Sequence, residues 1–404
     1  MFDLSSVVVG LEIGTSKICA VVADVAVDGT FRVLGLGQAE SKGVRKGEIV
    51  NPADLPELLR HAVKEAEEMA DVEVRSVWLG VTGGHIQETH NKGFHPIASD
   101  DREITEDDVD DVLRIAKTLN LPAHNHPIHL IRQHFGIDGQ VTENPVRMYG
   151  NRLEADVLVL HGNFNRLQGA IRAVKSLNIE VEDVAFNGLA SQLAVLTAEQ
   201  KELGTLLLDM GAGTTEYVVT EDGIVHHAGV LAVGGDHVSQ DLVTGLRIPL
   251  GLAEQLKVKH GSASLDDPRL GDTLQLPSGN GLAPRSINRE HFHRIMHARL
   301  EETLQIIEQK LADAVVLSRL HGGVVLTGGC SQTAGLLQLA ESVFQLPVQL
   351  GQIRCVAGMN ESVNQPEFAT PVGLAKFGSF RVQRQLASRA RFNVRRTLTQ
   401  LFGR

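Results

Sequence analysis

Two short segments of this chain, far apart in the sequence, repeat one pattern. The first, VVVGLEIGTSKICAVV, covers residues 7–22, and the second, LLLDMGAGTTEYVV, covers residues 206–219. Each has an apolar strand, a carboxylate, a turn rich in Gly, Ser or Thr, and a second apolar strand. The pair predicts two hairpins that hold a phosphate chain from two sides, although two ordinary core hairpins would show the same pattern.

The turns have the chemistry that phosphate binding needs. Glycine lets the backbone approach a ligand closely, a tight turn points consecutive N–H groups at an anion, and hydroxyls add donors. Glu12 and Asp209 precede the two turns. Because Mg²⁺ keeps much of its hydration shell and binds few carboxylates, these two side chains are candidate magnesium ligands through water.

The composition predicts two or more domains. The 404 residues are 43% hydrophobic and only 4% aromatic, so the cores are expected to be aliphatic. Three cysteines without a close pair favour a reducing compartment over a disulfide framework or a zinc site. The first residues lack the basic segment of a signal peptide, and no apolar run approaches the ~20 residues of a membrane span.

Charge is unevenly distributed along the chain. The net charge is −11, yet the segment from Arg381 to Arg404 holds seven arginines and no acidic residue. The acidic body argues against a nucleic-acid binder, and the basic tail is therefore expected to be a specialised segment.

Hydrophobic periodicity and turn residues predict the order of the elements. A helix is expected over 54–69 and a strand over 76–81, followed by a small inserted α+β module over 85–162 in which Thr105 and Asp108 form a capping box. Residues 163–201 are expected to be mostly helical around a strand at 180–185. Further on we expect a loop at 268–284, a long helix at 289–317, and a strand at 324–327 that enters a Gly-Gly turn. Two segments of small residues, 188–191 and 371–375, are expected to cross as closely packed helices at a hinge.

Two phosphate hairpins, a later Thr-Gly-Gly turn and two small-residue helices, in this order, resemble the actin/Hsp70/sugar-kinase ATPase superfamily, whose two related halves close on ATP. No Gly-Lys dipeptide occurs, so no P-loop of the Walker type competes with this interpretation. Within the superfamily the chain resembles the FtsA family of bacterial actin-like cell-division proteins over nearly its whole length. GLEIGTSK at 10–17 is close to the FtsA form of the first motif. EITEDDV at 103–109 and QHFGIDG at 133–139 resemble the subdomain that FtsA carries in place of the usual actin subdomain.

This resemblance implies an α/β actin-like fold with an inserted small α+β subdomain, and ATP and Mg²⁺ as ligands. Glu12 and Asp209 would face the magnesium ion. With Asp209, the residues that would contact the nucleotide are Gly14, Thr15, Ser16, Lys17, Gly211, Gly213, Thr214, Thr215, Gly234, Gly235, Glu254, Lys257, Gly328, Gly329 and Ser331. The i, i+3 spacing of Glu254 and Lys257 puts both on one helix face, where they reach the adenosine or form an exposed ion pair.

The resemblance also divides the chain into subdomains. The first core subdomain (1A) is expected to comprise 1–84, 163–195 and 367–378, and the second (2A) 196–235 and 318–366. The inserted subdomain (1C) comprises 85–162, and subdomain 2B, on the adenosine side, comprises 236–317. A linker at 379–391, either a tether or a helical extension, leads to an amphipathic membrane-targeting helix at 392–404.

One residue departs from the superfamily pattern. Asn187 stands in the hinge segment where many members have Glu-Pro or a catalytic polar residue. An amide cannot act as a base, so we expect ATP binding with weak or no hydrolysis.

Partner surfaces follow from the same resemblance. FtsA proteins bind the C-terminal tail of the tubulin-like FtsZ around the long helix, so Arg285, Arg299 and Glu302 are expected to contact that tail. Its acids suit Arg299, for which an ordinary solvated arginine is the alternative. His293 and His297 have a metal-compatible i, i+4 spacing without a zinc motif, so they are expected on a helix surface. Other expected partners are further copies of the chain in an actin-like filament, and later division proteins at the inserted subdomain.

The last residues have the pattern of a helix that lies in a membrane interface. At about 100° per residue, Val394, Leu398, Leu401 and Phe402 share one face, with Arg396 largely opposite and Arg395 flanking the apolar side. Docking on the chain's own domain is the alternative, but the absence of acids favours anionic lipid. Burial of four side chains gives ~6–10 kcal/mol gross, and ordering a short helix subtracts several. One tail is therefore a reversible anchor, which a filament would strengthen.

Together these expectations describe a polymerising, ATP-binding adaptor that ties the FtsZ ring to the cytoplasmic face of the inner membrane at the division septum, as a peripheral membrane protein. A sugar kinase or exopolyphosphatase of the same fold would need a catalytic aspartate near the cleft and has no use for the tail. An ATPase scaffold of pilus assembly can share the inserted module, so the FtsZ-binding region and the tail distinguish it.

Overall fold

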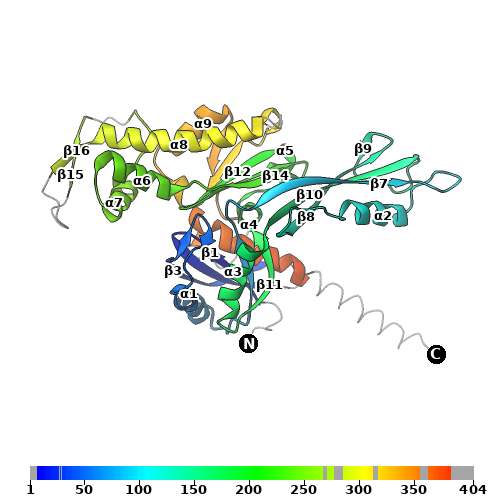
Figure 1. The fold of residues 1–404 in the computed structure, drawn as a ribbon, viewed down its shortest axis with the longest axis horizontal. Coiled ribbons are helices and arrows are strands. Elements are labelled where there is room, and N and C mark those ends of the chain that lie inside the picture. Colours follow the sequence, from blue (N-terminus) through cyan, green and yellow to red (C-terminus); the bar gives the residue numbers. More distant parts are fainter. Residues whose placement is uncertain are drawn as a thin grey trace.

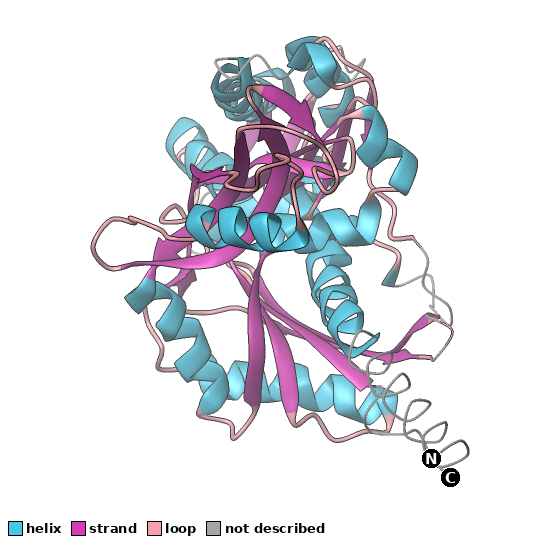
Figure 2. Ribbon diagram, turned by 90° about the vertical axis from the view of Figure 1, so that its right-hand side faces the viewer, coloured by secondary structure: helices cyan, strands magenta, loops and turns pink. Residues whose placement is uncertain are grey.

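The computed structural model describes residues 7–26, 28, 30–266, 271–276, 285–312, 317–354 and 363–383. Two halves lie one above the other, each built on a five-stranded sheet, and a third sheet projects to one side (Figure 1). Helices cover the sheets of both halves (Figure 2). This arrangement confirms the α/β fold with an inserted subdomain that the sequence predicts.

The lower half in Figure 1 contains the first predicted hairpin. Its strands run in the order β11-β6-β1-β2-β3. β1, β2 and β3 form an antiparallel meander, whereas β6 and β11 extend the sheet in parallel. The bounds are Val7–Ile13 for β1, Lys17–Val25 for β2, Phe31–Glu40 for β3, Ser76–Val81 for β6 and Glu180–Phe186 for β11.

The upper half repeats this topology. Its strands run in the order β14-β13-β12-β17-β18, again with an antiparallel meander followed by two parallel strands. The bounds are Thr205–Met210 for β12, Thr215–Glu221 for β13, Ile224–Leu231 for β14, Val324–Thr327 for β17 and Val348–Leu350 for β18. The sequence repeat at the two hairpins is therefore a repeat of a whole sheet.

The inserted subdomain interrupts the lower half between β6 and α3, Phe164–Lys175. Four strands in the order β7-β10-β8-β9 carry one helix, α2, whose capping box between Thr105 and Asp108 is formed as predicted. Apolar side chains of α2 and the sheet make a separate small core. The bounds are Gln87–Pro96 for β7, Glu106–Ala116 for α2, Asn125–Ile137 for β8, Gln140–Thr142 for β9 and Arg152–Asn163 for β10.

The helices of the lower half include the predicted hinge pair. Besides α1, Leu55–Ala70, and α3, Phe164–Lys175, there are α4, Asn187–Val195, and a helix over 369–383. The last two cross so closely that a side chain on Gly373 would overlap the Ala190 carbonyl oxygen. The close crossing of small-residue helices is thus confirmed. A short hairpin of β4, Val44–Arg45, and β5, Glu48–Ile49, contacts α3.

The upper half has its own set of described helices. They are α5, Ala198–Leu203, α6, Gly235–Leu246, α7, Leu250–His260, α8, Arg289–Ala312, and α9, Leu336–Phe344. The predicted loop at 268–284 is wrong in part, because β15, Thr273–Leu276, pairs there with β16, Arg285–Asn288. Leu274 and Leu276 are buried, and their spacing is the two-residue period of a strand. The Gly and Pro residues around this short segment favoured a loop instead.

Two features concern the C-terminal part. The described residues 379–383 continue the helix that begins at 369, so the first part of the predicted linker is helical. The rest of that linker and the predicted amphipathic helix at 392–404 lie outside the described residues. Among the helices that are described, none is long and apolar enough to cross a bilayer.

Candidate nucleotide-binding cleft

The two predicted turns close with the same hydrogen bond. The Gly14 N–H donates to the Lys17 carbonyl, and the Gly211 N–H donates to the Thr214 carbonyl, each over 2.9 Å. In both hairpins the carboxylate stands just before the turn, at Glu12 in β1 and Asp209 in β12. The sequence repeat therefore produces two copies of one backbone geometry.

The turns face each other across a narrow gap. A side chain on Gly213 would overlap the Thr15 hydroxyl and lie 2.9 Å from the Lys46 backbone. The same Thr15 hydroxyl accepts a hydrogen bond of 3.0 Å from the Gly47 N–H. Only glycine fits between these groups, so the second turn reaches the first through bare backbone.

A group of buried carboxylates lies behind the turns. Asp209 accepts hydrogen bonds from the hydroxyls of Ser191 and Thr370, the latter over 2.9 Å. Glu216 is paired with Asp209 across β12 and β13, and it accepts a hydrogen bond from the Thr82 hydroxyl. Glu12, which is half-buried and lines the cleft, stands beside these two buried carboxylates, and one of its oxygens is buried without a hydrogen-bond partner.

Burial controls the charge of this group. Loss of solvation raises the pKa of Glu12 and of Glu216 to about 8, and like charges nearby add to both shifts. Burial also raises the pKa of Asp209, against the hydrogen bonds from Ser191 and Thr370. Lys17 opposes the shifts of Glu12 and Asp209. A bound cation would stabilise the ionised form of these carboxylates and lower their pKa.

The donor set fits magnesium. Within the described residues, no group of three or more His, Cys, Asp and Glu side chains is placed to hold a metal ion by itself. Magnesium does not need such a cage, since it is usually held by one or two carboxylates, water and substrate phosphates. The unpartnered buried oxygen of Glu12, beside Asp209, is the kind of ligand that such an ion would use.

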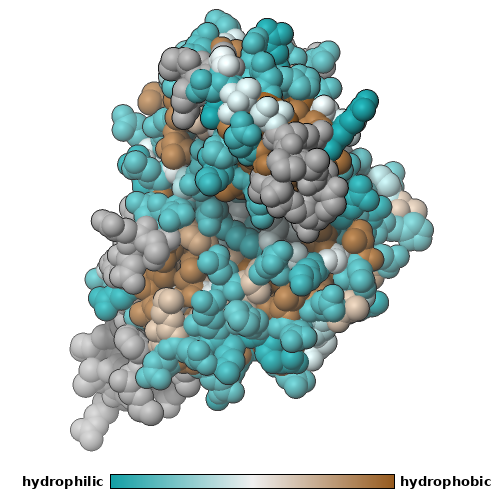
Figure 3. All heavy atoms as spheres, turned by 90° about the vertical axis from the view of Figure 1, so that its left-hand side faces the viewer, coloured by the Kyte–Doolittle hydropathy of each residue, from teal (hydrophilic) through white to brown (hydrophobic). Residues whose placement is uncertain are grey.

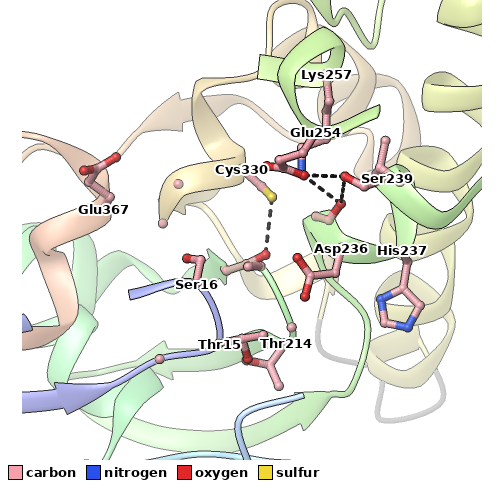
Figure 4. A pocket seen from close by; sticks show the side chains of 18 of the residues that line it. Thr15, Ser16, Thr214, Asp236, His237, Ser239, Glu254, Lys257, Cys330 and Glu367 are labelled. Atoms are coloured by element: carbon pink, nitrogen blue, oxygen red, sulfur yellow. Dashed lines mark hydrogen bonds and ion pairs between the residues drawn. The ribbon is translucent and has the colours of Figure 1, made fainter. Parts of the chain in front are cut away.

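The far wall of the cleft comes from α6 and α7. The Lys257 ammonium donates to the Gly235 carbonyl over 3.0 Å and pairs with Glu254 at 2.7 Å. Glu254 also accepts from the Ser239 hydroxyl, and the Cys330 thiol donates to the Gly211 carbonyl over 3.3 Å. Figure 4 shows these side chains around an open space, opposite Thr15 and Ser16 of the first turn. The predicted placement of Glu254 and Lys257 on one helix face is correct.

These walls enclose a cleft of about 1360 Å³ between the halves. Seen from the left of Figure 1, the surface is hollowed there, with hydrophilic side chains around the mouth (Figure 3). The predicted residues that line it are Glu12, Gly14, Thr15, Ser16, Lys17, Asp209, Gly211, Gly213, Thr214, Gly235, Glu254, Lys257, Gly328 and Gly329. Residues distant in the sequence thus meet at one site.

Three predicted contact residues stand behind the wall instead of on it. Thr215 is fully buried and its hydroxyl donates to the Val233 carbonyl. Ser331 is buried, and its hydroxyl donates to the Gly328 carbonyl. Gly234 packs on the carbonyls of the second turn. These residues shape the turns without lining the cleft, because the two hydroxyls are bonded to backbone carbonyls and the Gly234 N–H donates to the His237 ring.

Lys17 has partners of its own. Its ammonium donates to the Glu367 carbonyl over 2.5 Å, lies 3.6 Å from the Glu367 carboxylate and sits over the Phe368 ring. It still lines the cleft and is part-buried. A bound phosphate would therefore share this ammonium with the turn at 366–368.

Sequence reasoning missed several groups at the carboxylates. Glu216 lay within the second motif but was not singled out. Ser191 and Thr370 belong to the two small-residue helices, whose hydroxyls both reach Asp209. A signal was available, since each hydroxyl interrupts an otherwise apolar helix. Their convergence on one carboxylate is a tertiary property that no local pattern contains.

The predicted partner residues are less open than expected. Arg299 is already bonded to Asp241 of α6 at 2.5 Å and to Glu302 of its own helix. The hydrogen bonds that Arg299 donates to Asp241 raise the pKa of this guanidinium further. Arg285 begins β16, and its side chain lies outside the described ones. The surface position predicted for His293 is wrong, because this side chain is fully buried, and its Nε2 lies 3.1 Å from the His260 carbonyl.

Two sheets of equal topology around a cleft with facing glycine turns define an actin-like ATPase fold. Solved structures show the same fold, among them a chain of the PilM-PilN type IV pilus biogenesis complex. It is 17% identical, with a TM-score of 0.66 and coverage of 92% of this chain and 98% of that one. MreB 5 of Spiroplasma citri bound to AMPPNP matches with a TM-score of 0.57 at 13% identity, over 96% of this chain and 99% of that one. Relatives of this fold thus bind adenine nucleotides.

Sequence comparison is more specific. The model for "Cell division protein FtsA" matches residues 206–373, and that for "SHS2 domain inserted in FTSA" matches residues 83–161. The cell division protein FtsA of Pseudomonas aeruginosa is 34% identical over 92% of this chain and 89% of its own length. FtsA of Escherichia coli is 32% identical over 92% of this chain and 90% of its own. The chain belongs to the FtsA family of cell division proteins.

Proposed function

We propose that this chain is an ATP-binding, polymerising adaptor that anchors the FtsZ ring to the cytoplasmic membrane and helps to assemble the division machinery. The observation that carries the nucleotide part is the approach of two turns closed by the same backbone hydrogen bond, with Gly213 against Thr15, in front of buried carboxylates. Family membership carries the cell-division part.

ATP would bind with its phosphates between the turns. Backbone N–H groups of glycine turns and hydroxyls of Thr15, Ser16 and Thr214 suit phosphate oxygens. Glu12 and Asp209 would hold Mg²⁺, which neutralises phosphate charge when it is bound. The adenosine would lie toward α6 and α7, where Glu254 and Lys257 stand.

Hydrolysis is expected to be weak or absent. Asn187 lines the cleft at the hinge, and it is only 4% exposed. Its amide oxygen packs against the backbone of Gly80, whose added side chain it would overlap. An amide in this position neither accepts a proton nor is free to move, so it supplies no general base.

The FtsZ C-terminal tail is the proposed partner on α8. The Arg299 guanidinium is already paired with Asp241 and Glu302. An acidic residue of the tail could therefore bind Arg299 only by replacing one of these two carboxylates. Such an exchange preserves the ion pairing and costs little, because the site is partly exposed. Arg285 and Glu302 would flank the peptide.

The membrane is the proposed site of action, on its inner face at the division septum. The argument rests on the sequence of 392–404, with Val394, Leu398, Leu401 and Phe402 on one face and Arg395 and Arg396 beside it. Filaments of many copies would raise the effective concentration of this weak anchor. Later division proteins would bind at the inserted subdomain.

A pull-down with a synthetic FtsZ C-terminal peptide tests the adaptor role. We expect the intact protein to be retained, and Arg299→Glu to lose at least tenfold in affinity. Arg294→Glu is the matched control, because Arg294 lies on the same helix and is also paired, with Glu290. Equal retention of both variants would remove Arg299 from the interface, and no retention of the intact chain would overturn the FtsZ partnership.

Two other functions share this fold. A pilus-assembly scaffold is compatible with the PilM-like architecture, but at 17% identity that likeness concerns the fold alone. A small-molecule kinase would phosphorylate a sugar in the presence of ATP. The FtsZ-peptide pull-down distinguishes the proposed adaptor from a pilus-assembly scaffold. An assay for ATP-dependent formation of a phosphorylated sugar distinguishes it from a small-molecule kinase.

A further inference from the structure

The inserted subdomain holds the second half of the molecule through one strand. β14 is an edge strand of the upper sheet, and the insert lies along it (Figure 1). Glu88 of β7 accepts a hydrogen bond of 2.7 Å from the Ala228 N–H, and its other oxygen lies 3.0 Å from the His227 ring nitrogen. The buried side chain of Gln133, on β8, donates to the Val225 carbonyl over 2.8 Å.

Aromatic packing extends these contacts. The rings of His90 and His227 lie 6.1 Å apart edge to face, and those of His134 and His226 lie 5.9 Å apart. His90 is in turn 3.3 Å from Asp156 of β10. We call the contacts of β14 with Glu88, Gln133, His90 and His134 the β14 clamp. It joins two strands of the insert, β7 and β8, to one strand of the opposite half.

The clamped strand is hydrogen-bonded to the second phosphate turn. In the β13–β14 ladder Leu231 pairs with Thr215, and Val230 pairs with Glu216. Thr215 is the first residue after the turn, and Glu216 is one of the buried carboxylates. A displacement of the second turn must therefore move β14, because ladder hydrogen bonds do not stretch.

The insert also begins at the cleft. Thr82, which bonds to Glu216, lies between β6 and the insert, and Gly84, the last residue before the insert, lies against Ala232 just beyond β14. The second hairpin is thus connected at two places: at Glu216 to the segment that leads into the insert, and along β14 to the insert itself. With two connections, the insert would follow both a rotation and a translation of the second hairpin. With a single connection, the hairpin could rotate about that point without moving the insert.

We propose that the β14 clamp couples nucleotide occupancy of the cleft to the position and mobility of the inserted subdomain. This inference rests on the proposed binding of ATP between the turns. Coupling is reciprocal, so a partner bound to the insert would change nucleotide affinity by the same factor as nucleotide changes the affinity of that partner. The alternative is a static cover that only protects the free edge of β14.

Hydrogen exchange of the full chain, with and without ATP and Mg²⁺, separates these possibilities. We expect nucleotide to slow exchange in the turn at 211–215 and also, by at least threefold, in the clamped strands at 87–96 and 224–231. In Glu88→Ala the turn should still respond, whereas the response at 87–96 should disappear. Glu154→Ala is the matched control, because Glu154 lies in the same sheet but pairs with Arg152 inside the insert.

The remaining outcomes are decisive as well. A response at 211–215 without one at 87–96 in the unaltered chain means a static cover and overturns the coupling. The same holds if Glu88→Ala keeps the full response. Should Glu88→Ala unfold, Gln133→Ala removes a single bond of the clamp and is expected to weaken the response. No response at 211–215 would instead count against ATP binding, which keeps the two failures apart.

Discussion

At the scale of single residues, Gly213 determines how closely the two turns approach. Its missing side chain leaves room for the Thr15 hydroxyl and the Lys46 backbone. In Gly213→Ala the added methyl group must push the turns apart, so we expect ATP affinity to fall at least tenfold, as measured by titration with a fluorescent ATP analogue. Gly169→Ala is the control, since no atom lies within 4 Å of the added carbon there. Unchanged affinity in Gly213→Ala would mean that the turns do not clasp the phosphates together.

Asp209 is the residue whose loss should affect binding most. It combines the place of a magnesium ligand with two hydrogen bonds from opposite helices, at Ser191 and Thr370. In Asp209→Ala both hydroxyls lose their acceptor and the ion loses a ligand, so ATP binding in the presence of Mg²⁺ should fall by a hundredfold or more in the same titration. Wild-type affinity would count against the cleft as the nucleotide site.

Glu12 makes the nucleotide-free chain sensitive to pH. Burial raises its pKa from an ordinary 4.5 to about 8, so the folded state binds a proton that the unfolded state has released between these values. This contribution is complete below about pH 4.5 and is lost as the pH rises through about 8. We therefore expect the melting temperature to fall between pH 6 and 8.5, and to fall less in Glu12→Gln. Scanning fluorimetry with Glu154→Gln as control tests this, and an equal fall in Glu12→Gln would contradict it.

At the scale of elements, the crossing of α4 with the helix over 369–383 organises the carboxylates. Ser191 and Thr370 reach Asp209 only because Gly373 lets the helices touch. In Gly373→Ala the methyl group must separate them, at a cost of about 1–3 kcal/mol, so we expect a lower melting temperature together with weaker ATP binding. Gly251→Ala on α7 meets nothing within 4 Å and should be neutral or slightly stabilising. An effect on stability without one on binding would mean that the crossing does not position Asp209.

The elements also show which features of the structure can be predicted from local sequence pattern. The two hairpins, the capped helix of the insert and the small-residue crossing were predictable, because each depends on residues close in sequence. The hairpin at β15 was not, since its alternation is only four residues long and stands among Gly and Pro. Nor could pattern reveal that Arg299 is occupied by Asp241, that His293 is buried, or that Ser331 faces away from the cleft. These facts depend on contacts between elements that the sequence places far apart.

At the scale of the whole molecule, a cleft between halves, an insert clamped to the second half and a basic tail are three separate devices on one chain. The cleft is the proposed nucleotide site, and the insert lies against β14 rather than free in solution. The helix over 369–383 is fixed to the lower half, where Arg381 pairs with Asp183 at 2.7 Å and lies over Trp78. The described part of the chain therefore ends at a fixed place on the lower half.

This fixed exit point bears on the last prediction, which concerns residues 392–404. In the proposed anchor, four apolar side chains and nearby arginines would give each copy a weak, salt-sensitive affinity for anionic lipid, with each arginine adding about 1 kcal/mol near the surface. Deletion of 392–404 should therefore abolish sedimentation with anionic vesicles, whereas the ATP affinity should stay unchanged, since the cleft residues are untouched. Neutral vesicles are the control for charge, and the intact chain should pellet with them poorly. Because filaments multiply weak anchors, pelleting should also rise steeply with protein concentration. Equal sedimentation of the intact and the shortened chain would remove the tail from the membrane contact and leave the body of the protein to make it.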